Sequence, residues 1–183
     1  MAGTDQQDTL MAIRCQLGDP LAWEELVRRW HPRLWRFVLG MLSDRTSAED
    51  VLQNVWLRVI RSLVRLREPE KLSAWLYGIA RSAITDRLRE QYRHPPADEV
   101  SEVSDSDDSL KAVDVSDSLR AGLAQLHPAD REVVVLFYFE ERSLDEVAEI
   151  SRIPSGTVKS RLHRARRVIR EALEQESAEH DQA

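Results

Sequence analysis

Residues 143–166 read SLDEVAEISRIPSGTVKSRLHRAR, and this stretch decides the fold of the C-terminal part of the chain. Ser143 and Glu146 have the spacing of a capping box, which predicts that a short helix begins there. Pro154 predicts a break, and a second helix is expected from Ser155 onward because apolar residues recur at helical spacing after it. Two helices separated by such a turn predict a helix-turn-helix. The apolar positions of the second helix are Val158, Leu162, Ala165 and Ile169.

The outer face of that second helix is cationic and rich in hydrogen-bonding groups. From Arg152 to Arg170 the chain carries seven basic residues and no acidic one, which is the charge pattern of a polyanion-binding surface. In helix-turn-helix geometry this face enters the major groove, where such side chains suit base edges and phosphates. A helical hairpin with a merely solvated basic face is the alternative. The predicted DNA-binding residues are Ser155, Thr157, Lys159, Ser160, Arg161, Arg164 and Arg167.

Charge is distributed unevenly along the rest of the chain, so the formal net charge of −6 misleads. Residues 14–93 carry a net charge of +5, whereas residues 94–117 carry one Lys against eight Asp and Glu, a net of −7. The acidic segment is rich in Ser and Asp and has few apolar residues with which to offset the entropy of ordering. It is predicted to be a flexible linker.

Before the linker, apolar residues recur at helical spacing in three runs, beginning near Leu26, Val51 and Leu72. A capping-box pattern at residues 46–49 predicts the start of the second helix, and Pro69 interrupts the chain before the third. The predicted fold is all-α, with two small helical domains joined by an acidic flexible linker. The expected boundaries are 10–93 for the first domain, 94–116 for the linker, 117–175 for the second domain and 176–183 for an acidic tail.

Composition excludes several classes of protein. The single cysteine, Cys15, can form neither an internal disulfide nor a metal-binding pair, and the five histidines lack ligand spacing. Neither a metal nor another cofactor is therefore expected, and no pattern typical of an enzyme site is present. No apolar run approaches the roughly 20 residues that span a bilayer. We expect a cytoplasmic protein without membrane insertion.

The motifs resemble a known family. Residues 145–166 are similar to region 4 of bacterial sigma factors of the extracytoplasmic-function (ECF) class. Residues 48–57 resemble region 2.2 of the same class, and residues 74–81 with Asp86 and Arg89 resemble regions 2.3 and 2.4. The chain departs from the family pattern at four positions. Ser82 stands where Asn is usual, Arg152 where Gly is usual, and Glu141-Arg142 where Gly-Leu is usual.

The resemblance implies a transcription initiation factor that is not itself an enzyme. It would bind core RNA polymerase through the β′ clamp helices and the β flap, bind promoter DNA at −10 and −35 elements, and be controlled by an anti-sigma factor. The implied polymerase contacts are Asp50, Gln53, Asn54, Leu57 and Arg58. The implied −10 contacts are Arg65, Lys71, Trp75, Tyr77, Arg81, Ser82 and Arg89. The spacing of Trp75 from Leu72 and Ile79 is equally typical of a core residue.

Two other functions stay open at this point. A helix-turn-helix repressor with a helical dimerisation or effector domain would read a palindrome instead of two different elements. An adaptor of the anti-sigma kind is the second, although the zinc-binding form needs a His and Cys cluster that the sequence lacks.

Overall fold

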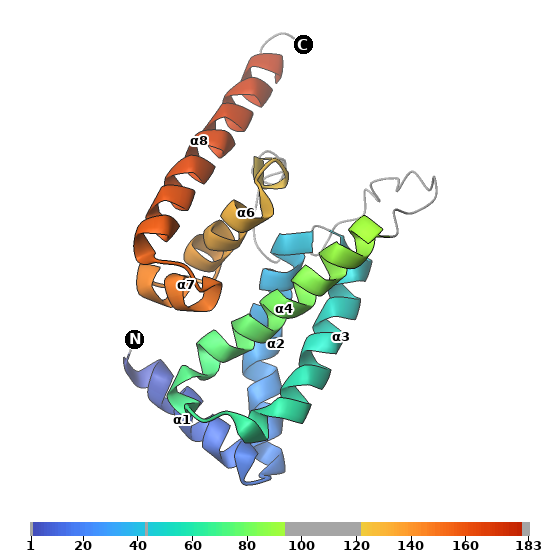
Figure 1. Cartoon of the computed structure of the whole chain (residues 1–183), viewed down its shortest axis with the longest axis vertical. Coiled ribbons are helices and arrows are strands. Elements are labelled where there is room, and N and C mark those ends of the chain that lie inside the picture. Colours follow the sequence, from blue (N-terminus) through green and yellow to red (C-terminus); the bar gives the residue numbers. More distant parts are fainter. Residues whose placement is uncertain (1, 43, 94–121, 181–183) are drawn as a thin grey trace.

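The computed structural model describes residues 2–42, 44–93 and 122–180, and throughout these ranges the chain contains helices and turns but no strand (Figure 1). The all-α prediction is therefore confirmed. The predicted linker, residues 94–116, lies outside the described residues. Helix α8 continues to His180, through the first residues of the predicted acidic tail.

The N-terminal unit consists of four α-helices. They are α1 (Ala2–Gln16), α2 (Pro20–Leu42), α3 (Arg45–Ser62) and α4 (Leu72–Arg93). Two 3-10 turns, η1 (Leu63–Arg65) and η2 (Pro69–Lys71), connect α3 to α4. Helices α2, α3 and α4 pack against one another, and α1 lies across one end of them beside η2 (Figure 1). The fully buried side chains between them include Trp30, Phe37, Val55 and Leu76.

Local capping explains where α3 begins. Asp44 has extended backbone dihedrals, and its carboxylate accepts a hydrogen bond from the Ser47 backbone N–H at 2.9 Å. Asp44 is thus the N-cap, and the prediction that residues 46–49 form the capping box was wrong by two residues. Sequence patterning also did not predict that a helix begins at Ala2. Helix α1 buries only a narrow face, with Met11, Ala12 and Cys15 in the core.

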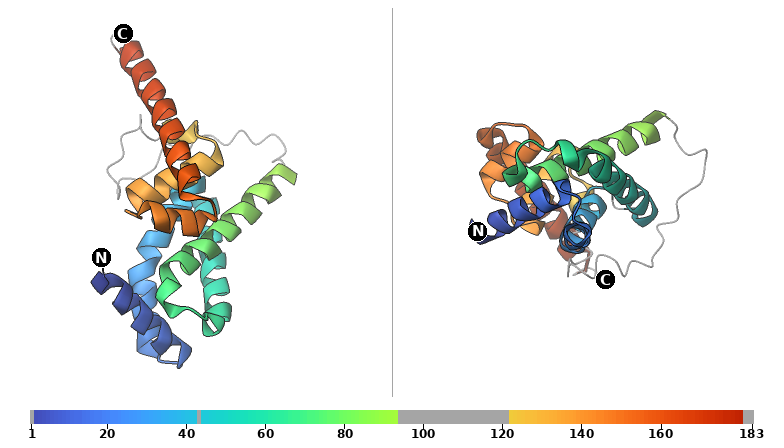
Figure 2. Two further views of the ribbon diagram at one scale, coloured as in Figure 1. Left: turned by 60° about the vertical axis from the view of Figure 1, so that its left-hand side comes forward. Right: turned by 90° about the horizontal axis from the view of Figure 1, so that it is seen from below.

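The C-terminal unit contains the helix-turn-helix. Its elements are α6 (Pro128–Val134), a π-helical turn η3 (Val135–Phe139), α7 (Leu144–Ser151) and α8 (Ser155–His180). Helix α6 begins at Pro128, as predicted, because a proline at the first helical position needs no hydrogen-bond acceptor. Helices α6 and α7 both pack on α8, whose C-terminal end projects beyond the rest of the chain (Figure 2).

The two units touch along one seam, which we define as the contacts of α2 and α4 with α6, η3 and α7. Their buried residues form one continuous cluster. Gly40 of α2 is the point of closest approach, because a Cβ atom there would lie 3.2 Å from the Val135 side chain of η3. The seam places the helix-turn-helix directly against α4.

Candidate nucleic-acid and polymerase interfaces

The helix-turn-helix has the geometry that its sequence predicts. The Ser143 hydroxyl accepts a hydrogen bond from the Glu146 N–H, and the Glu146 carboxylate accepts one from the Ser143 N–H, so the capping box is confirmed. Arg152 takes the left-handed conformation at φ 54° and ψ 46°. A non-glycine residue tolerates this conformation at a cost of roughly 1 kcal/mol, and the turn therefore keeps its shape without the usual glycine.

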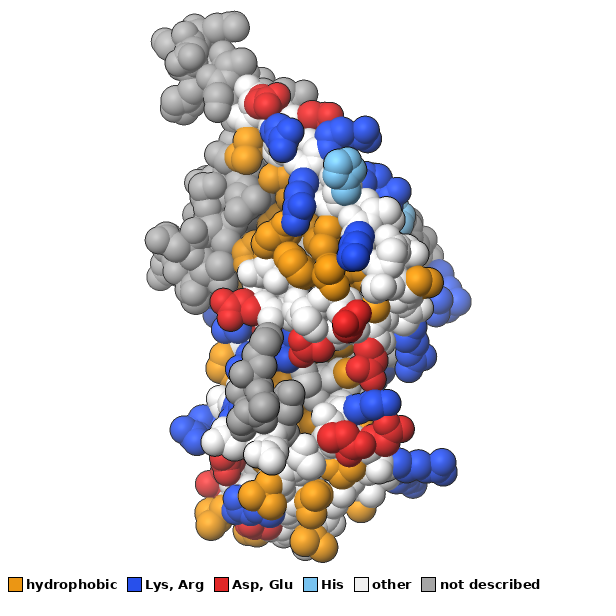
Figure 3. All heavy atoms as spheres, turned by 90° about the vertical axis from the view of Figure 1, so that its left-hand side faces the viewer, with side chains coloured by type: hydrophobic (Ala, Val, Ile, Leu, Met, Phe, Trp, Pro, Cys, Tyr) orange, Lys and Arg blue, Asp and Glu red, His pale blue; other side chains and the backbone are white. Residues whose placement is uncertain are grey.

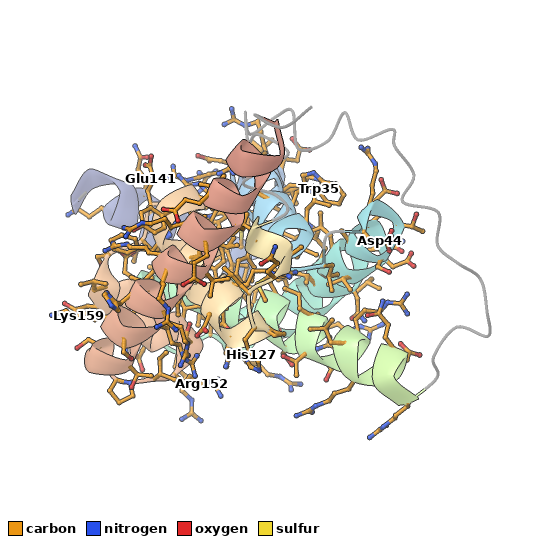
Figure 4. The ribbon with its side chains drawn as sticks, turned by 90° about the horizontal axis from the view of Figure 1, so that it is seen from above. Trp35, Asp44, His127, Glu141, Arg152 and Lys159 are labelled. Atoms are coloured by element: carbon orange, nitrogen blue, oxygen red, sulfur yellow. The ribbon has the colours of Figure 1, made fainter. Side chains whose placement is uncertain are left out.

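The start of α8 presents an open polar face. Ser155, Lys159 and Ser160 are exposed, and Lys159 points away from the N-terminal unit (Figure 4). Thr157 is half-buried, and its carbonyl accepts a hydrogen bond from the Ser160 hydroxyl at 2.9 Å. Among the described residues no charged partner lies within ion-pair distance of Lys159. This ammonium group is therefore available to an external anion.

Two arginines of the predicted DNA-binding set turn toward α6 instead. The Arg164 guanidinium forms a two-bond ion pair with the buried Asp130 carboxylate, at 2.7 and 2.6 Å. Arg161 donates to the Ala129 carbonyl at 3.3 Å. Arg167 is exposed and lies 3.8 Å from Glu171. The residues that the sequence placed on one DNA-reading face thus divide into a free group near the start of α8 and a group that anchors α6.

Basic side chains surround apolar ones over α8, as Figure 3 shows on one face of the molecule. Acidic side chains gather below them, where α7 lies. Asp145 and Glu149 are the exposed acids of α7. The C-terminal unit therefore turns an acidic edge toward the N-terminal unit and a basic face away from it.

A pocket of about 550 Å³ lies beside α4, between the two units, and we call it the α4 pocket. Three of the predicted −10 residues line it: Lys71, Trp75 and Ser82. Trp75 is half-buried, so its ring contributes to the core and to the pocket wall at once. The loop before α4 is held by Gln16 of α1, whose amide donates to the Leu63 and Leu66 carbonyls at 3.1 and 2.8 Å.

Other predicted −10 residues are placed differently. Tyr77 is fully buried, its ring packs edge-on against Trp30 and Phe37, and its hydroxyl donates to Glu140 at 2.6 Å. Burial and the neighbouring Glu140 carboxylate raise the pKa of Tyr77. The prediction that Tyr77 contacts DNA is therefore wrong for this arrangement. The buried spacing of Leu76, Tyr77, Ala80 and Ile84 is the sequence signal that could have placed it in the core.

Three basic residues complete the set of predicted −10 contacts. Arg81 forms an ion pair with Glu132 of α6 at 2.9 Å and is half-buried. Arg65 and Arg89 are exposed. Arg89 lines a second, mostly apolar pocket of about 250 Å³ that α6 closes.

The predicted polymerase contacts lie on α3. Asp50, Gln53, Asn54 and Leu57 are all exposed on this helix. Arg58 is tied down, because it donates to Asn54 at 3.0 Å and pairs with Asp86 of α4 at 2.9 Å. Sequence reasoning missed the exposed apolar side chains Ile60 and Val64, which continue the line of Leu57 at spacings of three and four residues. Exposed apolar stripes of this kind mark protein-binding surfaces.

Three features bear on metal binding, membrane insertion and thiol chemistry. In residues 2–42, 44–93 and 122–180, no three His, Cys, Asp or Glu side chains are grouped so that they could hold a metal ion. No helix in the same ranges is both long and apolar enough to cross a membrane. Cys15 is buried, and desolvation raises the pKa of its thiol to about 11.

Comparison with known proteins agrees with this geometry. Residues 26–94 match the family described as Sigma-70 region 2, and residues 116–169 match Sigma-70, region 4. The chain is 37% identical over 156 residues to RNA polymerase sigma factor CarQ of Myxococcus xanthus, covering 83% of this chain and 89% of CarQ. It is 35% identical over 153 residues to ECF RNA polymerase sigma factor SigM of Mycobacterium tuberculosis, covering 81% of this chain and 76% of SigM.

A solved structure shares the fold. The structure of CnrH in complex with the cytosolic domain of CnrY superposes with a TM-score of 0.69 at 23% identity, covering 92% of this chain and 97% of the matched chain. The match of the N-terminal unit to Sigma-70 region 2 does not favour a repressor, in which this unit would be a dimerisation or effector domain. With both regions matched, and with close relatives along most of its length, the chain belongs to the ECF class of sigma-70 family RNA polymerase sigma factors.

Proposed function

We propose that this protein initiates transcription by binding core RNA polymerase and directing it to promoters with separate −10 and −35 elements. The observation that carries the proposal is that one chain combines an exposed cationic face on α8 of the helix-turn-helix with a pocket beside α4 that is lined by aromatic and cationic side chains. The protein is not itself an enzyme, and it acts where polymerase and chromosome are found, in the cytoplasm.

The −35 element is read from the start of α8. Lys159 and Ser160 supply the contacts to base edges, and Ser155 and Thr157 bind phosphate at the positive end of the helix dipole. Arg161 and Arg164 hold α6 at the correct angle through Ala129 and Asp130. They act as positioning residues, and their exposed edges can still reach the DNA backbone.

The −10 element is opened at the α4 pocket. Separating a base pair costs a few kcal/mol, which stacking on an aromatic ring and contact with cations can offset at roughly 1–3 kcal/mol per base. Trp75 supplies the ring, and Lys71 supplies a cation at the mouth. Ser82 provides a hydroxyl where the family usually has an amide. Arg65 and Arg89, both exposed, hold the flanking phosphates.

Core polymerase docks on α3 and on the C-terminal unit. The exposed polar residues Gln53 and Asn54 with the apolar stripe of Leu57, Ile60 and Val64 form the surface for the β′ clamp helices. The C-terminal unit meets the β flap. The acidic residues 94–117 would run through the basic RNA path of the polymerase, where their charge resembles that of nucleic acid.

An anti-sigma factor is the proposed regulator. The sigma factor RpoE of Bartonella quintana, which shares the fold at a TM-score of 0.67, was solved in complex with the anti-sigma factor NepR, and the same architecture in this chain supports a partner of that kind.

The proposal is tested by pull-down of purified core RNA polymerase, followed by transcription from a promoter that requires its −35 element. Wild-type protein should bind core and support transcription. Lys159→Ala should retain core binding and lose transcription. Failure of the wild-type protein to bind core would contradict the proposal, and equal transcription by Lys159→Ala would contradict the −35 assignment.

A further inference from the structure

The second pocket of the molecule, of about 250 Å³, lies where α2, α4 and α6 meet, and we call it the α6 pocket. Its apolar walls follow from helical spacing, since residues four apart lie on the same side of a helix. Phe37 and Met41 line it from α2, and Ile84 and Leu88 line it from α4. The first turn of α6 supplies the third wall. A molecule in this pocket would therefore touch both units.

A row of polar side chains borders the apolar wall of α4. Arg81, Thr85 and Arg89 recur every four residues and all line the α6 pocket. Arg81 pairs with the Glu132 carboxylate at 2.9 Å, and Glu132 also accepts the Ser151 hydroxyl at 2.7 Å. The Thr85 hydroxyl donates to the Arg81 carbonyl at 2.9 Å. The acid of the lining is thus already neutralised by a cation, and Arg89 is the member of the row that is left open.

Two groups at the edge of the α6 pocket have hydrogen-bond donors to spare. Arg89 is exposed, and within residues 2–42, 44–93 and 122–180 its guanidinium has neither a hydrogen-bond nor an ion-pair partner. His127, at the start of α6 in Figure 4, is also exposed. Its Nδ1 accepts a hydrogen bond from the Ala129 backbone N–H at 3.3 Å, so the neutral ring carries its proton on Nε2, where it can be donated.

These features define the chemistry of a ligand. Binding pockets are typically apolar, with a few polar groups that fix the orientation of the ligand. Here the polar groups are one unpaired cation and one neutral donor, which together match a single negative charge. The volume equals the share of about eight water molecules at roughly 30 Å³ each, so the apolar body is no larger than one ring or a short chain.

We propose that the α6 pocket binds a small amphipathic carboxylic acid. The carboxylate pairs with Arg89 and accepts a hydrogen bond from His127, and the hydrocarbon body packs against Phe37, Ile84 and Leu88. Because the ligand touches α2 and α4 of one unit and α6 of the other, its binding stabilises the contact between the units.

The inference goes beyond the proposed function and does not depend on it. The proposed function gives Arg89 a DNA phosphate, whereas a carboxylate can pair with the same guanidinium in the absence of DNA. Binding of the acid is therefore measured on the full chain alone, without polymerase or promoter. A failure of the transcription assay would leave that measurement unaffected.

The test is a titration of the full chain with benzoate, followed by the methyl resonances of the protein in nuclear magnetic resonance spectra. The ring of bound benzoate should shift the signals of Ile84 and Met41 in a saturable manner, with one dissociation constant for both. Ile13 of α1, outside the pocket, should not shift. Benzyl alcohol has the same ring without the charge and should bind about tenfold more weakly, because it lacks the charge-assisted hydrogen bond.

Three variants sharpen the assignment. Arg89→Leu should weaken benzoate binding about tenfold and leave the affinity for benzyl alcohol unchanged. Arg93→Leu removes an exposed cation of the same helix that lies outside the pocket, and it should change neither affinity. Ala129→Leu narrows the pocket and should weaken the binding of both compounds. Helical circular dichroism verifies that each variant is folded.

The inference makes the position of the shifts and their dependence on charge decisive. Equal affinities for benzoate and benzyl alcohol would overturn it, and so would equal losses of benzoate affinity in Arg89→Leu and Arg93→Leu. Shifts that do not saturate, or that leave Ile84 and Met41 unchanged, would likewise exclude the α6 pocket as the site.

Discussion

The two surfaces proposed to read promoter DNA in this sigma factor differ in their access to solvent. Lys159 and Ser160 on α8 are exposed, and Lys159 points away from the N-terminal unit (Figure 4). In the α4 pocket, Trp75 is half-buried, and the exposed Lys71 is already paired with Glu68 and Glu149. The packing of the two units at the seam therefore determines which of the two proposed DNA-binding surfaces is exposed to solvent. The face proposed to read the −35 element is exposed, whereas the pocket proposed for the −10 element is walled on one side by residues of the helix-turn-helix.

The largest effect is expected on the unfolding free energy, when a buried side chain on the inner face of α8 is truncated. Leu162 is 3% exposed on the inner face of α8, and Leu162→Ala should cost about 2–5 kcal/mol of unfolding free energy because it leaves a cavity. Urea denaturation followed by circular dichroism measures this cost. Ser160→Ala on the outer face should change stability by less than about 0.5 kcal/mol. Equal losses in both variants would show that α8 does not have the inner and outer faces described.

The next effect concerns DNA affinity at the open face. Lys159→Ala should weaken binding to a −35 duplex by roughly 1–3 kcal/mol if the ammonium group reaches a base edge. Arg170→Ala removes the same charge farther along α8 and serves as the matched control. Fluorescence anisotropy at fixed salt compares the two. If both variants lose the same affinity, Lys159 contributes only general electrostatic attraction.

A third effect concerns the polymerase surface of α3. Replacing Gln53 and Asn54 together by Ala should weaken association with core polymerase about tenfold, because exposed contacts at such a surface typically contribute a kcal/mol or more. Surface plasmon resonance gives the affinity. Glu24→Ala with Arg28→Ala, on an exposed part of α2, should leave it unchanged. A double variant of α3 that binds normally would place the polymerase elsewhere.

The smallest effect is a pH dependence of the seam. Burial raises the pKa of Glu140 above its ordinary value of 4.5, despite the opposing influence of Tyr77, Arg36 and Arg142. A raised pKa in the folded state stabilises the fold below pH 4.5, and this contribution is lost as pH rises through the raised value. Glu140→Gln should therefore flatten the pH dependence of the unfolding free energy above pH 4.5, as measured by denaturant titration at several pH values. An unchanged slope would mean that Glu140 titrates normally.

Much of the fold was predictable from the sequence because apolar periodicity and capping patterns indicated helices in the same segments. The apolar periodicity of α2, α3 and α4 and the capping box at Ser143 identify helices without reference to tertiary structure. The start of α3 was misplaced because Asp44, a better positioned N-cap, precedes the residues that match the capping-box pattern. Helix α1 was missed because its buried face is narrow and its first turn is polar.

The candidate site was less predictable, because the seam determines which side chains are free. Tyr77 is aromatic and lies in a motif that resembles a −10 reader, but its ring is enclosed by Trp30 and its hydroxyl is used by Glu140 of the other unit. No signal near Tyr77 in the sequence reports a partner that lies 63 residues away. The pairing of Arg164 with Asp130 likewise joins residues that are distant in the sequence, 34 positions apart. Residue type and helical phase could predict which faces are cationic, but not which cations are already paired.

The central claim is that this chain directs core RNA polymerase to promoters with two separate elements. The most direct test is to sequence run-off transcripts made by core polymerase and this protein on DNA of the genome that encodes it. The account predicts new start sites, each preceded by one −10 and one −35 element at a constant spacing, all of which disappear with Lys159→Ala. No polymerase-dependent start sites, together with binding of the protein to palindromic DNA, would contradict it.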